Sequence, residues 1–454
     1  MVIIGLFLTW LFGFLVLRII NKKVDALSTV FLSYLLGLGL QTLFMFYMAI
    51  IHIKLTLYSV SSVLVGIILI LLVIQLLRGD KFWDFFISLA NQLKNFVHIF
   101  KNETNSFERI MTLFIIAIFI YVVVVGVYWP VFGWDSVALY DFRAKVFTST
   151  GYMDDAIRRG YFFGYPLMTS MAHTWVYLLG FGYPKFLYSF MYISLSMLFY
   201  LSIRPGLSRW AALLFTFIMI FSPQLFSHAA FDYTNLPYTV FFFISEVFLI
   251  KWFKEKNVPF VILSGLLMGI ATWIRSTDPF WIVNIGAIII AVIFMKRSLK
   301  NLVIYLAVFL PIQQSWNIFL SSMSPNVSSQ ALVVGSVGVL LKGIDFVRIV
   351  QVLDFVNRVI GPILALYVAI TCVSFYFVKD HLKDNAFLYL LLLSNFGVLF
   401  LGSYIFSFIY PGWNAIGESL GRMVFVFIPL LTYTTAINFG TFSNWKTHEK
   451  QKNI

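Results

Sequence analysis

The chain has 454 residues, of which 61% are hydrophobic, 19% aromatic and only 11% charged, and its formal net charge is +13. This composition leaves too little polar surface for a water-soluble globule and excludes that class. The basic residues are scattered through short loops, which is typical of the cytoplasmic side of membrane proteins and argues against nucleic acid as a partner. We therefore expect an all-α, polytopic integral membrane protein that contacts membrane lipid.

The chain opens with four apolar runs of spanning length, at residues 2–20, 26–51, 57–77 and 109–128. In lipid, only helices satisfy the backbone polar groups over such runs. Residues 78–108 interleave basic and aromatic side chains, a pattern that predicts an amphipathic helix on the cytoplasmic surface. We assign residues 1–108 to an N-terminal part made of the first three spans and this interfacial helix.

Basic turns set the orientation expected for the later spans. The turns at 204–209, 251–256, 296–300 and 379–383 should be cytoplasmic. With these turns inside the cell, successive spans cross the membrane in alternating directions. The spans are 209–226, 235–252, 258–275, 280–296, 301–322, 359–378, 386–406 and 422–440. Residues 166–203 contain two apolar runs, but they join a loop placed outside to a turn placed inside and so make one net crossing of the membrane. We therefore expect a short outer helix followed by one span. The total is about thirteen spans, and residues 441–454 form a cytoplasmic tail.

The loop at residues 129–165 is a long polar interruption that this topology places outside the cell. Asp135 precedes a predicted juxtamembrane helix at 137–147, on which apolar and charged side chains take opposite faces. Asp141 and Lys145 lie four residues apart in the order that favours a salt bridge, so we expect Asp141 to stabilise this helix. Asp135 has two interpretations, a helix N-cap and a general base, and the sequence leaves both open.

The same topology brings other charged residues at helix ends to the outer face. Charges at membrane depth cost roughly 2.5–3.5 kcal/mol each and tend to line functional cavities. We therefore expect a single external site that combines the loop with Asp232, Arg275, Asp278, Glu418 and Arg422. His173 and His228 have no partner at metal-ligand spacing, so we expect them to be hydrogen-bonded helix histidines.

Several short motifs follow one another in a recognisable order. They are Asp135 early in the external loop, Tyr165-Pro166-Leu167, Ser222-Pro223, Asp232, the stretch 269–278 that ends with Arg275 and Asp278, and Arg422 with Pro429. This order resembles the GT-C superfamily of membrane glycosyltransferases, in the branch of the protein O-mannosyltransferases and lipid A aminoarabinose transferases. The resemblance covers residues 109–440, which we assign to a glycosyltransferase-like core.

The resemblance implies transfer of a sugar from a polyprenyl-phosphate donor to a hydroxyl acceptor at the outer face of the plasma membrane. It implies that Asp135 is the general base and that Arg275 and Arg422 hold the departing phosphate, because a guanidinium stays charged and donates two hydrogen bonds at once. The other expected substrate-binding positions are Asp141, Arg143, Tyr165, Asp232, Asp278 and Glu418. The acceptor stays open between a glycan, a polymer, a lipid and a protein.

A divalent metal also stays open as a cofactor. Many members of the superfamily carry adjacent acidic residues in the first loop, whereas Ser136 follows Asp135 here.

Two other functions remain open. A cell-envelope polysaccharide polymerase or ligase also has many spans, but its main external loop comes late in the chain and carries paired arginines. A lipid or glycolipid flippase or transporter would predict internal repeats and helices broken at mid-membrane, and no such symmetry is visible. The richest loop of this chain comes early and is acidic, which favours the glycosyltransferase.

Overall fold

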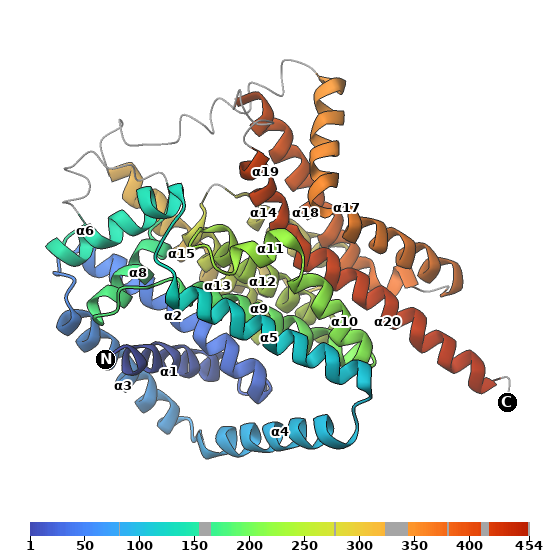
Figure 1. Cartoon of the computed structure of the whole chain (residues 1–454), viewed down its shortest axis with the longest axis horizontal. Helices are drawn as coiled ribbons and strands as arrows, with labels where there is room; N and C mark the ends of the chain where they lie inside the picture. Colours follow the sequence, from blue (N-terminus) through green and yellow to red (C-terminus); the bar gives the residue numbers. More distant parts are fainter. Residues whose placement is uncertain are drawn as a thin grey trace. The chain divides into compact units, whose positions relative to one another are not determined.

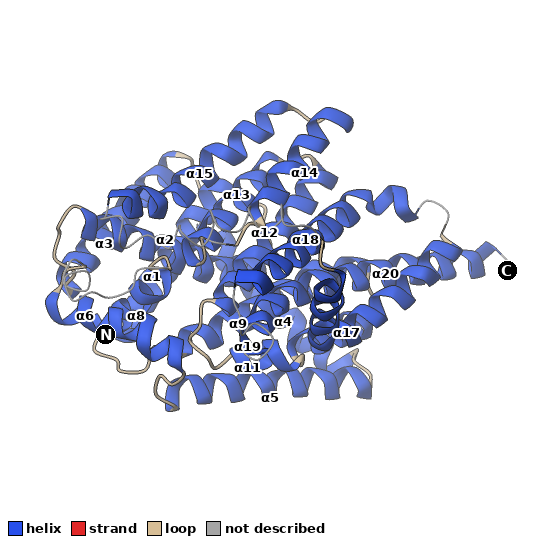
Figure 2. Ribbon diagram, turned by 90° about the horizontal axis from the view of Figure 1, so that it is seen from above, coloured by secondary structure: helices blue, strands red, loops and turns tan. Residues whose placement is uncertain are grey.

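The computed structural model describes residues 1–80, 82–153, 165–276, 278–322, 344–378, 381–409 and 417–452. Within these ranges all regular secondary structure is helical (Figure 2), which confirms the predicted all-α class. The chain forms two compact units, each described below by itself. The first unit comprises Met1–Leu198, His228–Phe241 and Gly269–Arg275, and the second comprises Phe199–Ser227, Phe242–Met268 and Ser276–Ile454.

In the described part of the chain, ten helices are long and apolar enough to cross a membrane. They are α1 (Val2–Ile20), α2 (Ala26–Ile50), α3 (Leu57–Leu77), α5 (Ser106–Tyr128), α9 (Phe186–Ile203), α12 (Asn235–Glu255), α15 (Leu299–Ser322), α17 (Phe346–Phe377), α18 (His381–Ile409) and the continuous helical stretch Gly421–Trp445, most of which belongs to α20 (Ile428–Lys452). Each coincides with one of the predicted spans. The chain is therefore a polytopic membrane protein.

The other three predicted spans fall on shorter apolar helices. These are α10 (Arg209–Ile220), α13 (Val258–Ile274) and α14 (Trp281–Phe294), with 12, 17 and 14 residues. At 1.5 Å per residue they are roughly 18–26 Å long, less than the thickness of a typical hydrocarbon core. The count of thirteen spans thus stays a prediction, although every predicted span contains a helix.

In the first unit, α1 and α2 pack closely against each other (Figure 1). Their backbones come nearest at two glycines. A Cβ added at Gly13 would lie 1.9 Å from the carbonyl oxygen of Ser33, and one added at Gly37 would lie 1.9 Å from that of Thr9. Small residues allow this close approach between membrane helices, where packing replaces the hydrophobic effect as the attraction. Both positions therefore require glycine.

We expect Gly13→Ala to lower the free energy of unfolding by about 1–3 kcal/mol, because the added methyl group overpacks a backbone contact. Thermal unfolding of the protein in detergent measures this effect. The matched control is Gly66→Ala in α3, where an added Cβ meets no atom within 4 Å. The control should unfold at or slightly above the wild-type temperature. An unchanged midpoint for Gly13→Ala would contradict the close α1–α2 contact.

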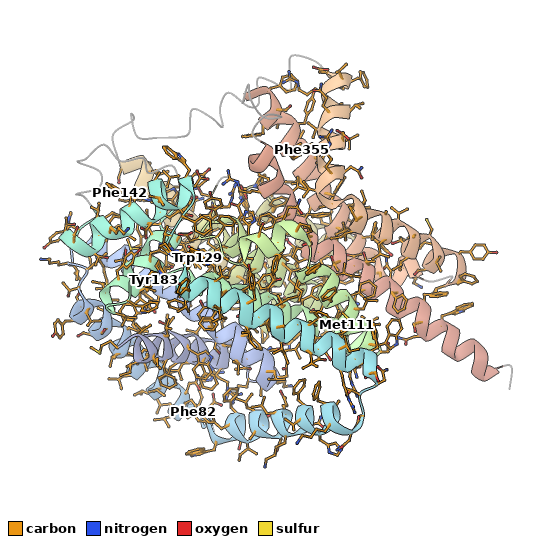
Figure 3. All side chains as sticks on the ribbon, in the orientation of Figure 1. Phe82, Met111, Trp129, Phe142, Tyr183 and Phe355 are labelled. Atoms are coloured by element: carbon orange, nitrogen blue, oxygen red, sulfur yellow. The ribbon has the colours of Figure 1, made fainter. Side chains whose placement is uncertain are left out.

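The basic and aromatic segment after α3 forms helix α4 (Phe82–Asn102). Phe85 is buried and its ring stacks at an angle on Trp10 and Phe14 of α1, while Trp83 on the other side is 76% exposed. Figure 3 shows the side chains of α4, with Phe82 labelled. The predicted helix is thus confirmed and docks on α1, and its place at the cytoplasmic surface stays a prediction.

Residues 166–203 agree with the expected short helix followed by one span. Helix α8 (Met168–Leu178) has 11 residues, too few to cross a membrane, and its residues from Met168 to Val176 are buried. Gly180, with φ +81°, takes the left-handed conformation in the turn after it, and α9 is the candidate span.

In the second unit, three helix boundaries differ from the prediction. Helix α17 begins at Phe346 rather than at residue 359, since Asp345 caps it by accepting a hydrogen bond from the Arg348 N–H. Helix α10 ends at Ile220, and a separate short helix α11 (Pro223–His228) follows, because Pro223 has no N–H to continue the helix. Helix α20 continues to Lys452 through most of the predicted tail.

Candidate functional site

The helix predicted within the loop at residues 129–165 is present in the first unit. It consists of a π-helical turn, η1 (Ser136–Asp141), that continues into α6 (Phe142–Thr150). Single π-helical turns occur frequently at functional sites. Gly133, with φ +99°, forms the bend that leads into this turn. Residues 154–164 of the loop lie outside the described ranges.

Asp135 stands at the N-cap position of η1, but its side chain makes no capping hydrogen bond. Its φ and ψ of −63° and −35° are helical, whereas a capping residue usually has extended values. The carboxyl is half-buried and so lies near the surface. The capping interpretation of Asp135 is therefore not supported, and the general-base role stays a prediction.

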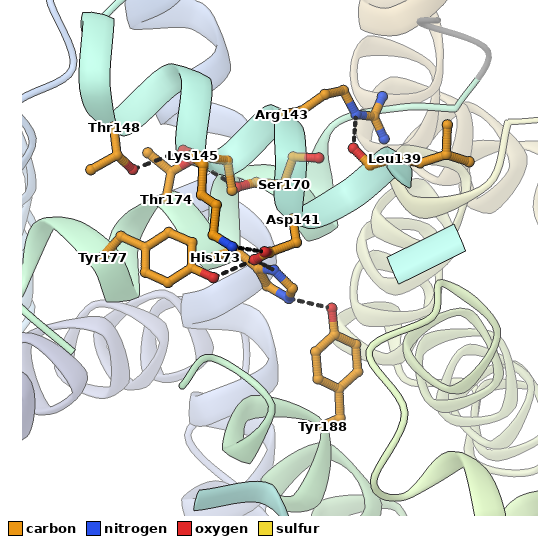
Figure 4. Close-up of polar contacts among 11 residues, drawn as sticks. Leu139, Asp141, Arg143, Lys145, Thr148, Ser170, His173, Thr174, Tyr177 and Tyr188 are labelled. Atoms are coloured by element: carbon orange, nitrogen blue, oxygen red, sulfur yellow. Dashed lines mark hydrogen bonds and ion pairs between the residues drawn. The ribbon is translucent and has the colours of Figure 1, made fainter. Parts of the chain in front are cut away.

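Asp141 is the centre of a buried polar cluster that joins η1 to α8 (Figure 4). Its Oδ2 lies 2.8 Å from Lys145 Nζ and its Oδ1 lies 3.4 Å from His173 Nδ1. The hydroxyl of Tyr177 donates a hydrogen bond to the same carboxylate. On the other side of the imidazole, His173 Nε2 lies 2.9 Å from the hydroxyl of Tyr188 in α9. The predicted Asp141–Lys145 ion pair is confirmed, and His173 is a hydrogen-bonded helix histidine as expected.

These contacts keep Asp141 ionised. Burial alone would raise its pKa, but the hydrogen bond and charge of His173, followed by the hydrogen bonds of Lys145 and Tyr177, outweigh burial and lower the pKa to about 2. A carboxylate with three partners and so low a pKa is a poor proton acceptor. Asp141 therefore holds the loop in place and is a poor candidate for a general base.

The lowered pKa of Asp141 predicts a pH dependence of stability. A carboxyl whose pKa falls from 3.8 unfolded to about 2 folded stabilises the protein fully above about pH 5, by about 2 kcal/mol, and loses this contribution as the pH falls toward 2. The difference in unfolding free energy between wild type and Asp141→Asn in detergent should thus shrink from pH 6 to pH 3.

The matched control for this measurement is Asp354→Asn in α17. Asp354 is 55% exposed and pairs with Arg358, so its substitution should change the unfolding free energy by less than about 0.5 kcal/mol throughout. A difference for Asp141→Asn that stays constant down to pH 3 would show that the carboxylate is not selectively stabilised in the fold.

Asp232 is a second buried carboxyl of the first unit. It lies in the segment before α12 with a fully buried side chain, and among the described residues neither of its oxygens makes a well-aligned hydrogen bond, although the Ser136 hydroxyl is close to the carboxyl. Burial raises the pKa of Asp232, and nearby His173, Ser136 and Lys185 oppose the rise only in part. A buried carboxyl with two unused acceptor oxygens indicates a place where a hydroxyl donor can bind.

Lys185, at the start of α9, is a buried cation in the same environment. Its Nζ donates a hydrogen bond to the carbonyl oxygen of Pro130 at 3.3 Å and lies 4.1 Å from the centre of the Phe132 ring. Burial lowers the pKa of Lys185, and the charge of Asp232 opposes this shift. The lysine thus ties the beginning of the loop at residues 129–165 to α9.

Arg143 fixes the aromatic-Pro-Leu element next to α6. Its guanidinium is buried and donates from Nε to the Leu139 carbonyl at 3.0 Å and from Nη1 to the Tyr165 carbonyl at 3.1 Å. It also lies 5.5 Å from the centre of the Tyr140 ring. Arg143 therefore positions Tyr165.

Arg275 comes to the same place from the end of α13. Its Nη1 lies 3.5 Å from Thr234 Oγ1, and its guanidinium carbon lies 5.9 Å from the centre of the Tyr165 ring. The hydroxyl of Tyr140 lies 3.2 Å from the same Thr234 oxygen. Segments far apart in the sequence thus converge on two arginines and two tyrosines.

Most of the predicted site residues belong to the first unit. Arg143 and Arg275 both contact Tyr165, Asp141 and Asp232 both lie near His173, and Asp135 directly precedes the π-helical turn. Three predicted residues, Asp278, Glu418 and Arg422, belong to the second unit. The side chain of Glu418, in α19 (Gly417–Val424), is outside the described set. The part that these three play in the site stays a prediction.

The sequence did not predict the contributions of Tyr177, Tyr188, Lys185 and Thr234. Of these residues, the sequence could have indicated only Tyr177 of α8. Polar residues interrupt this apolar helix, which is too short to span the membrane. Across the described ranges, no group of three His, Cys, Asp or Glu side chains is placed to hold a metal ion.

Comparisons with protein-family models, curated proteins and solved structures found no match to this chain. Its function therefore has to be argued from its own residues.

Proposed function

We propose that the chain is a glycosyltransferase of the plasma membrane that moves a sugar from a polyprenyl-phosphate donor to a hydroxyl acceptor on the outer face. The observation that carries the proposal is the cluster of Arg143, Arg275, Tyr140 and Tyr165 in the same unit as Asp135. Two arginines beside aromatic faces, one of them directly after the apolar helix α13, suit a ligand with a phosphate, a sugar and a lipid tail.

The reaction assigns a role to each group. The acceptor oxygen attacks the anomeric carbon of the sugar, the bond from that carbon to the phosphate oxygen breaks, and polyprenyl phosphate leaves. Asp135 takes the proton of the acceptor hydroxyl as it attacks. Arg275 binds the departing phosphate, whose charge grows in the transition state, and there a guanidinium is most effective.

The buried carboxyls have supporting roles in this proposal. Asp141 holds η1 on α8 through His173 and Tyr177, so that Asp135 is presented at a fixed position. The buried oxygens of Asp232 are acceptors for hydroxyl groups of the sugar. A hydrogen bond from a ligand to such a buried group contributes specificity, because an analogue that lacks the hydroxyl leaves it unsatisfied.

Mass spectrometry of cells that lack the protein tests the proposal. We expect one polyprenyl-phosphate sugar to accumulate and one envelope glycan, polymer, lipid or protein to lose a sugar, with both changes reversed when the gene is restored. Accumulation of single unpolymerised repeat units on a lipid would instead indicate a polymerase or ligase. Donor trapped at the inner face would indicate a flippase, and unchanged lipid-linked sugars would refute the proposal.

Purified protein in vesicles tests the chemistry directly. The accumulated lipid, labelled in its sugar, should lose the label to an acceptor extract only when the protein is present. Addition of EDTA to the same assay decides whether a divalent metal takes part.

A further inference from the structure

The second unit contains a buried polar cluster that sugar transfer does not use. Glu246 lies near the middle of α12, and Asn284 of α14, Tyr305 of α15 and Asn395 of α18 lie around it. All four side chains are fully buried. The amides of Asn284 and Asn395 lie within hydrogen-bonding reach of the Glu246 carboxyl, and the Tyr305 phenol is close enough to feel its charge. Polar side chains of four apolar helices thus meet around one carboxyl.

The hydrogen bonding of this cluster is incomplete. Within the described part of the chain, no well-aligned hydrogen bond is made by either oxygen of Glu246, by Asn284 Oδ1, by the amide oxygen and nitrogen of Asn395, or by the Tyr305 hydroxyl, although the two amides approach the Glu246 carboxyl. Asn284 is oriented by its other end, since its Nδ2 donates to Ser245 Oγ at 3.3 Å. Ser245 in turn donates to the Ser264 carbonyl at 2.9 Å. The amide oxygen of Asn284 is therefore held, with its acceptor capacity unused.

Unused acceptors outnumber unused donors in this cluster. Buried polar atoms are nearly always hydrogen-bonded, and a buried group without a partner costs about 1–3 kcal/mol. An ionised carboxylate at membrane depth additionally needs a compensating positive charge. No lysine, arginine or histidine of the described residues forms an ion pair with Glu246. The missing charge must then come from a proton or from a bound cation.

The chemistry of the donors indicates which cation fits. Carboxylate, amide and phenol oxygens are hard ligands, which suit alkali and alkaline-earth ions rather than the metals that prefer sulfur or imidazole. One carboxylate supplies a single negative charge, which matches a monovalent ion in an otherwise neutral, water-poor surrounding.

We propose that Glu246, Asn284, Asn395 and Tyr305 form an intramembrane site for a small monovalent cation of the Na⁺ class. In this site Na⁺ replaces the proton of the Glu246 carboxyl, so that binding of one ion releases one proton. The bound ion joins α12, α14, α15 and α18 and stabilises the second unit.

Thermal unfolding in detergent tests the site, with NaCl titrated against choline chloride at constant ionic strength. We expect Na⁺ to raise the unfolding temperature of the wild-type protein with saturation, as a ligand of the folded state does. The proton competes with Na⁺ for the Glu246 carboxyl. The apparent Kd for Na⁺ should therefore rise about tenfold for each pH unit by which the pH is lowered, in the range where the carboxyl is protonated. Asp354→Asn, which removes an exposed carboxylate, should keep the whole response.

Glu246→Gln keeps the shape of the side chain and removes its charge, so the variant should lose the Na⁺ response at every pH. A second measurement needs no variant: addition of NaCl to weakly buffered wild-type protein should release up to one proton per chain, and choline chloride should release none. An equal response to both salts, or a saturable Na⁺ response that persists in Glu246→Gln, would overturn the proposal. Neither readout depends on sugar transfer, so the result is independent of the proposed function.

Discussion

The Asp135→Asn variant should lose sugar transfer by about 10²–10⁴-fold, the range that a general base contributes. The substitution changes one oxygen for an NH₂ group and keeps the side-chain volume. Asp135 is half-buried and makes no capping hydrogen bond to η1, and thermal unfolding of the variant in detergent checks that the fold is retained. A base acts only in the transition state, so kcat should fall while KM for the donor stays near its wild-type value.

Initial rates in vesicles at saturating and limiting donor separate these two constants. Asp354→Asn is the control for removal of a carboxylate and should keep full activity. Asp141→Asn gives a useful contrast, because it should reduce the amount of folded protein through loss of the contacts with Lys145 and His173. Transfer at the wild-type rate by Asp135→Asn would show that Asp135 is not the base, and Asp232→Asn would then be the next variant to assay.

Much of the fold could be predicted because apolar length is a local property of the chain. Each predicted span contains a helix, and the Asp141–Lys145 pair was predictable because both residues lie on one helix face four positions apart. The early start of α17 was not predicted. The predicted span began at residue 359, because charged residues such as Asp354 and Arg358 interrupt the apolar pattern before it. In the structure these charges pair on one exposed face of the helix.

The partners within the site could be predicted much less well. His173 and Tyr188 lie on different helices, so their contact with each other and with Asp141 depends on how α8, α9 and η1 pack. No spacing in the sequence carries that information. The burial of Lys185 was hidden for the same reason, since it stands beside a turn, where exposure would be the ordinary expectation.

Replacement of Arg275 should weaken use of the donor more than use of the acceptor. Arg275 contacts Thr234 and the Tyr165 ring, which leaves its planar guanidinium in a defined orientation. Hydrogen bonds to charged groups contribute about 1.5–3 kcal/mol, so Arg275→Gln should lower kcat/KM for the donor by roughly 10- to 100-fold. Arg275→Lys keeps the charge but not the two parallel donors, and should recover only part of the loss.

Competition experiments with the lipid product give the sharpest readout of this arginine. If Arg275 binds the phosphate, inhibition by polyprenyl phosphate should weaken in proportion to the loss of kcat/KM, while KM for the acceptor stays the same. Arg358→Gln, which removes an exposed arginine that pairs only with its helix neighbour Asp354 among the described residues, should change neither constant. If Arg275→Gln raised KM for the acceptor alone, the arginine would belong to the acceptor side of the reaction. The phosphate would then have to be held by Arg143 or by a residue of the second unit, for which Arg422 is the predicted candidate.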